Sequence, residues 1–142
     1  MKDTITLLKE CDSGCKTALD GMEQVMKHVA SEDLRNEIIE CRKRHGGLEV
    51  RCRMLLDKAG EKEGNPPVIG TAMMRAGTGI RLAMDDGDAK IAEMMADGAA
   101  MGMKSIAKVM NACPGASEQS RALASDLIRE EGRFHDSMLR FI

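Results

Sequence analysis

The chain has 142 residues, a length that fits one domain with a sizeable hydrophobic core. It contains no Trp, no Tyr and only two Phe, and its apolar residues are mostly Ala, Met, Leu, Ile and Val, a mixture that favours helices over sheets. The formal net charge is −2 with both signs mixed along the chain, so the sequence has no basic stripe and almost no aromatic platform for nucleic acid.

Targeting signals are also missing from the sequence pattern. Residues 1–20 lack the apolar core of a signal peptide, and no run of about 18 uncharged apolar residues is present. Five cysteines, an odd number, fit a reducing compartment better than a disulfide framework. We therefore expect a cytoplasmic protein that neither binds nucleic acid nor spans a membrane.

Helical periodicity divides the chain into four long helices. Apolar residues recur in alternating three- and four-residue steps, which is the pattern of a bundle seam. Ser31 and Ser117 each precede acidic residues, as the N-caps of two of these helices do. The four predicted helices cover residues 3–29, 32–59, 88–111 and 117–141.

Between the second and third of these helices, the sequence pattern predicts a further helix, the crossover helix, over residues 66–84. Pro66 and Pro67 are suited to open it. Its apolar residues lie on more than one face, so we expect them to be covered on more than one side. We expect part of this helix, including Met74, to form a homodimer contact.

The two halves of the chain resemble each other at long spacing. Three residues match at an offset of 84 and three more at an offset of 86: Gly14, Val25 and Met26 with Gly98, Val109 and Met110, then Glu32, Arg35 and Gly46 with Glu118, Arg121 and Gly132. The inward-facing positions agree under the same offsets. This predicts two helical hairpins joined by a long connection.

Four glycines mark one level of the predicted bundle. Gly14, Gly46, Gly98 and Gly132 lie beside the inward positions Cys15, His45, Ala99 and Glu131. Glycine inside a helix costs about 1 kcal/mol relative to alanine, so four of them need a compensating reason. We expect them to let the helices approach one another around a polar layer.

This organisation is similar to the ferritin-like superfamily, and more narrowly to bacterial ferritin-like domains of unknown function. The stretches that carry the resemblance are Cys11-Asp12-Ser13-Gly14-Cys15 and Ala96-Asp97-Gly98-Ala99. The resemblance implies a single all-α domain over residues 1–142, an up-down four-helix bundle with an additional crossover helix.

The resemblance also shows where this chain departs from a di-iron site. Such sites take one Glu from each of two helices and a Glu-x-x-His from each of the other two. Here Cys15 and Ala99 occupy the first two positions, while His45 with Glu49 and Glu131 with His135 are spaced i to i+4. We therefore expect a degenerate metal site, no catalytic residues and a structural or association role.

Two interpretations of the polar layer remain open from the sequence. His45 and Glu131 form a buried hydrogen-bonded pair that fixes helix register, and no cofactor binds. Alternatively, Cys15, His45 and Glu131 hold a single Zn or Fe ion, with Glu49 and His135 about one turn away. In that second case the chain is a mononuclear metal-binding protein.

Overall fold

The computed structural model describes residues 1–61 and 87–142 and confirms the all-helical class. The predicted helix over residues 66–84, with Met74, lies outside the described residues. The described part holds no strand. Its elements are α1 (Lys2–Met26), α2 (Glu32–Lys58), α4 (Asp88–Ala112), α5 (Glu118–Met138) and a closing 3₁₀ turn, η1 (Leu139–Phe141).

The starts of α2 and α5 follow the predicted caps, while two helix ends differ. The helix α5 ends at Met138, and residues 139–141 of its predicted span form the 3₁₀ turn η1. The Ser31 hydroxyl accepts a hydrogen bond from the backbone N–H of Leu34, and Ser117 does the same for Ser120. The helix α1 ends at Met26 and not at residue 29. Val29 is still buried, but it packs into the core from the turn, so its place in the apolar series did not require a helix there.

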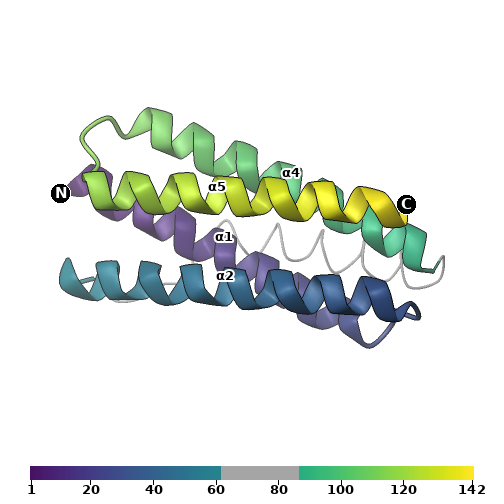
Figure 1. Cartoon of the computed structure of the whole chain (residues 1–142). Helices are drawn as coiled ribbons and strands as arrows, with labels where there is room; N and C mark the ends of the chain where they lie inside the picture. The colour runs from purple at the N-terminus through teal and green to yellow at the C-terminus, as the bar shows by residue number, and fades with distance from the viewer. Residues whose placement is uncertain (62–86) are drawn as a thin grey trace.

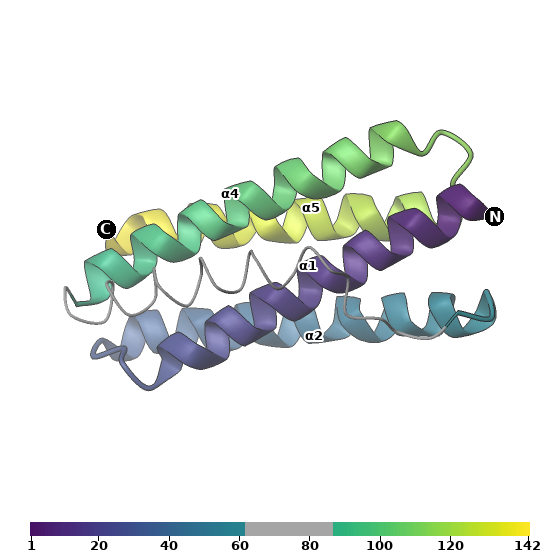
Figure 2. The ribbon, with the colours of Figure 1, turned by 180° about the vertical axis from the view of Figure 1, so that it is seen from behind.

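The two hairpins are arranged as Figure 1 shows. Within each hairpin the helices are antiparallel, α1 with α2 and α4 with α5, as expected. Because α2 and α4 run in the same direction, the order along the chain is up-down-down-up. The end of α2 and the start of α4 therefore lie at opposite ends of the bundle. Seen from behind in Figure 2, α1 packs against α4, and α2 packs against α5 on the other side.

The buried side chains form two apolar clusters, one toward each end of the bundle. One cluster gathers Met22, Val25, Leu34, Ile38, Ile91, Met95, Phe134 and Met138 with smaller residues. The other gathers Leu7, Leu8, Leu48, Leu56, Ile106, Leu123 and Leu127, together with Cys11, Cys15 and Cys52. His45 and Glu131 are buried between these clusters, because each lies between a residue of one cluster and a residue of the other on its own helix.

The four glycines do not share one role. A Cβ on Gly14 would lie 3.4 Å from Cδ1 of Ile106, and one on Gly132 would lie 3.4 Å from Sδ of Met103, so both positions are closely approached by α4. A Cβ on Gly46 or Gly98 would meet no atom within 4 Å. The expectation of close helix approach is therefore right for Gly14 and Gly132 and wrong for Gly46 and Gly98, which face open space.

Candidate functional site

The polar layer is built around His45, whose side chain is 0 % exposed. Its Nε2 lies 2.7 Å from Oε1 of Glu131, and its Nδ1 lies 2.9 Å from the carbonyl oxygen of Cys41. A carbonyl oxygen only accepts, and so does an ionised carboxylate. This geometry fits a doubly protonated imidazolium whose two ring N–H groups donate to the Cys41 carbonyl and to the Glu131 carboxylate.

The pKa of His45 is set by two opposing effects. Burial by itself lowers the pKa, because it disfavours the charged ring. The hydrogen bond and charge of Glu131, together with the Cys41 carbonyl, outweigh burial, and the pKa of His45 is raised above its ordinary value. The electrostatics agree with the geometry in favouring a charged histidine.

The Glu131 carboxylate lies against Gly102 of α4. Glu131 is 4 % exposed, and a Cβ on Gly102 of α4 would lie 3.5 Å from its Cδ and 3.6 Å from its Oε2. The ring of Phe134 stands edge-on to His45 with the centroids 6.1 Å apart. Gly102 belongs to the inward series of its helix, which is the signal that identifies it as a neighbour of the layer.

A second ion pair, which sequence reasoning missed, lies next to the first and joins the partly exposed Arg44 to the buried Glu130. Arg44 Nε donates to Oε1 of Glu130 at 2.6 Å, and Glu130 is 7 % exposed. Another guanidinium nitrogen of Arg44 donates to Sγ of Cys41 at 3.1 Å. Arg44 and Glu130 directly precede His45 and Glu131, and both pairs are separated by 86 residues. The offset of 86 between the two halves of the chain could therefore have predicted this contact.

The thiols near the layer are held in the protonated form. Burial raises the pKa of Cys15 and of Cys11, and the neighbouring Cys52 raises both further. Burial likewise raises the pKa of Cys41 to about 11. The raised pKa disfavours the thiolate that nucleophilic attack requires, and all three cysteines pack within the apolar clusters.

The two outer members of the predicted site lie apart from the pair. His135 is only partly buried, and its Nδ1 lies 3.1 Å from Oδ1 of the adjacent Asp136. Glu49 is half-buried and affects the layer through its charge, which contributes to the raised pKa of Cys15. The structure thus brings His45 and Glu131 into direct contact and leaves Glu49 and His135 at the edge.

As they lie, these residues do not fit a metal ion. A separation of 2.7 Å between Nε2 and Oε1 is that of a direct hydrogen bond. Within residues 1–61 and 87–142, no three His, Cys, Asp or Glu side chains are grouped so that they could hold a metal ion. The metal role of Cys15, His45, Glu49, Glu131 and His135 stays a prediction.

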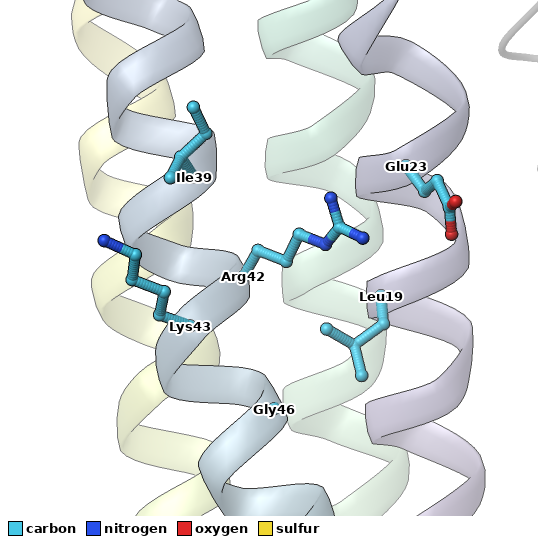
Figure 3. A pocket seen from close by; sticks show the side chains of 6 residues that line it. All are labelled: Leu19, Glu23, Ile39, Arg42, Lys43 and Gly46. Atoms are coloured by element: carbon cyan, nitrogen blue, oxygen red, sulfur yellow. The ribbon is translucent and has the colours of Figure 1, made fainter.

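An open pocket lies on the outer side of the α1–α2 hairpin (Figure 3). Leu19 and Glu23 line it from α1, and Arg42 extends across it from α2. Ile39, Lys43 and Gly46 complete the lining, which accounts for the open space around Gly46. The pocket lining contains no Ser, Thr, Cys or His.

Comparison with known proteins found no matching family model, curated protein or solved structure. The ferritin-like resemblance therefore rests on the sequence motifs alone. No helix among the described residues is sufficiently long and apolar to cross a lipid bilayer.

Proposed function

We propose that this chain is a cytoplasmic, ferritin-like bundle without enzymatic activity, in which a buried histidine–glutamate pair replaces the metal centre. In this proposal the protein acts through association with a second copy. The observation that supports the loss of the metal centre is that acceptors in the bundle core lie within hydrogen-bond distance of both ring nitrogens of His45.

The chemistry of the layer supports a role other than catalysis. His45 is fully buried, so a substrate in solution does not reach its ring. Ala99, which is also buried, offers no ligand or acid–base group from α4. The protonated Cys15 thiol offers no nucleophile, because nucleophilic attack requires the thiolate.

The surface of α2 supports the association role. Val50 and Met54 lie one turn apart on α2, and Met54 is 64 % exposed. Met101 on α4 is exposed to the same degree, at 63 %, but no second exposed large apolar residue of the described chain stands one turn from it. A pair of exposed apolar side chains is a better contact for a second copy than a single one. The predicted contact through Met74 lies outside the described residues.

The metal part of the proposal is tested by elemental analysis of the purified protein and by thermal unfolding with and without chelator. We expect less than one metal ion per chain and an unfolding midpoint that the chelator does not move. Stoichiometric Zn or Fe that is lost in His45→Ala would refute the proposal. The chain would then be a mononuclear metal-binding protein.

The association part is tested by sedimentation velocity over a range of protein concentrations. We expect a dimer that is weakened by Met54→Glu or Met74→Glu and unaffected by Met101→Glu, the matched control of equal exposure. A wild-type protein that stays monomeric at all concentrations contradicts the proposal. So does a dimer that Met54→Glu and Met74→Glu both leave intact.

A further inference from the structure

The two hairpins cap each other at the two ends of the bundle. At one end, the Asp88 carboxylate at the start of α4 accepts hydrogen bonds from the backbone N–H groups of Ala30 and Ser31, at 2.9 and 2.7 Å. At the other end, the Asp3 carboxylate at the start of α1 accepts one from Gly115, at 2.8 Å. The start of each hairpin thus holds the turn of the other, which is the reciprocity of an approximate two-fold axis.

The same approximate two-fold symmetry relates the members of the two ion pairs that join α2 to α5. We call Arg44–Glu130 and His45–Glu131 the central pairs. Counted from the N-caps at residues 31 and 117, Arg44 and Glu130 each come 13 residues later (44 − 31 and 130 − 117), and His45 and Glu131 each come 14 later. Because α2 and α5 are antiparallel, each of these residues faces its own counterpart in the other hairpin.

If one hairpin were replaced by a second copy of the other, each of these positions would be opposed by the same residue of that copy. Two α1–α2 hairpins joined in this way would oppose Arg44 to Arg44 and the charged His45 to His45. Two α4–α5 hairpins would oppose Glu130 to Glu130 and Glu131 to Glu131. Glu130 is 7 % exposed and, among the described residues, keeps only Arg133 of its own helix, at 4.0 Å, while Glu131 is 4 % exposed. Like charges opposed at such buried positions are strongly unfavourable.

We propose that the central pairs are specificity determinants: they make the α1–α2 surface bind an α4–α5 hairpin, from its own chain or from a second copy, and reject another α1–α2 hairpin. The same surface geometry serves both kinds of pairing. The opposite charges at equivalent positions decide between them.

Two other ion pairs between the hairpins do not distinguish an α4–α5 partner from an α1–α2 partner in this way. Arg51 pairs with Asp126 at 2.9 Å, and Arg140 pairs with Glu37 at 3.3 Å, but none of these residues faces its own counterpart. The Arg51 and Asp126 side chains are also solvent-exposed, where ion pairs contribute little.

The test uses full-length chains with charge reversals at the better exposed of the two central pairs. Arg44→Glu and Glu130→Arg each place like charges together within one chain, and the double variant restores opposite charges in reverse order. Urea unfolding gives the folding equilibrium constant. We expect each single variant to lose about 100-fold or more, and the double variant to regain at least about 10-fold over either single one.

The matched control is Lys43→Glu, the adjacent residue, whose 69 % exposed side chain pairs with Glu40. It is expected to change the constant by less than about 5-fold. A loss in Arg44→Glu no larger than in this control overturns the proposal. A double variant no more stable than the single ones overturns it as well, including the case in which all three fail to fold.

A second measurement separates partner choice from simple stabilisation. Chains carrying Arg44→Glu and chains carrying Glu130→Arg are unfolded, mixed and refolded together at high concentration. Both chains regain opposite charges at position pair 44–130 only by exchanging α4–α5 hairpins. We expect a 1:1 heterodimer in the mixture that neither variant forms alone. A mixture that contains only the species of the separate samples overturns the proposal.

Discussion

Removal of the Glu131 side chain tests the central electrostatic claim about the layer. In Glu131→Ala the Nε2–H of His45 loses its acceptor while the ring stays fully buried between two apolar clusters. Loss of one partner from a buried pair costs about 3–5 kcal/mol, because the remaining charge has no compensation. The whole free energy of unfolding of a domain is about 5–15 kcal/mol, so the loss is a large fraction of it.

The assay is urea unfolding followed by far-ultraviolet circular dichroism. Asp126→Ala is the control, because it removes the carboxylate partner of Arg51 from an exposed ion pair, which is worth about 0–1 kcal/mol. We expect Glu131→Ala to lower the free energy of unfolding several times more than the control does. Equal losses in the two variants would refute a charged, buried pair.

The pH dependence of the free energy of unfolding tests the same charged pair independently. The pKa of His45 is raised in the folded state, so its stabilisation is fully present below about 6.5, the unfolded value. That stabilisation is lost as the pH rises through the folded pKa. Wild-type stability should therefore contain a component that falls on the alkaline side of pH 6.5, and this component should be absent in Glu131→Ala. An identical pH profile in the two proteins contradicts the assignment.

Three further predictions concern separate features of the bundle. Gly46→Ala should raise the free energy of unfolding by about 0.5–1 kcal/mol, since its Cβ meets no atom within 4 Å. Gly14→Ala should raise it less, because Ile106 lies 3.4 Å from the added Cβ. Calorimetry of both variants checks that Gly46→Ala is the more stabilising of the two. Asp88→Ala should cost about 1–2 kcal/mol through two lost backbone hydrogen bonds, and a loss as small as that of the exposed Lys90→Ala speaks against the cap. The Cys15 thiol should react with a disulfide reagent only after unfolding, because burial shields it and raises its pKa; rapid labelling of the native protein, read by mass spectrometry, would contradict this.

The sequence predicted those parts of the fold that depend on local pattern. The three- and four-residue spacing placed His45 and Glu131 inside, and the serine caps fixed the starts of α2 and α5. Their direct contact followed from pairing the two halves. The same periodicity did not reveal where α1 ends, because Val29 stays buried from the turn.

Contacts that depend on distant partners were not predicted. Arg44 and Glu130 are 86 residues apart, and neither belongs to the apolar series from which the helices were predicted. The different environments of Gly46 and Gly14 depend on which side chains of another helix approach them, which spacing does not record. Asp88 looks like an ordinary turn residue until the turn it holds is known.

The reciprocal caps make each end of the bundle sensitive to residues far away in the chain. The Asp3 carboxylate and the Thr4 hydroxyl accept hydrogen bonds from the backbone of Gly115 and Ser117, which lie 112 and 113 residues further on. A deletion of the first few residues should therefore speed amide hydrogen exchange in the α4–α5 turn and leave the α1–α2 turn protected. A fused tag or a proteolytic cleavage at this terminus would therefore destabilise the α4–α5 turn before it destabilised the α1–α2 turn.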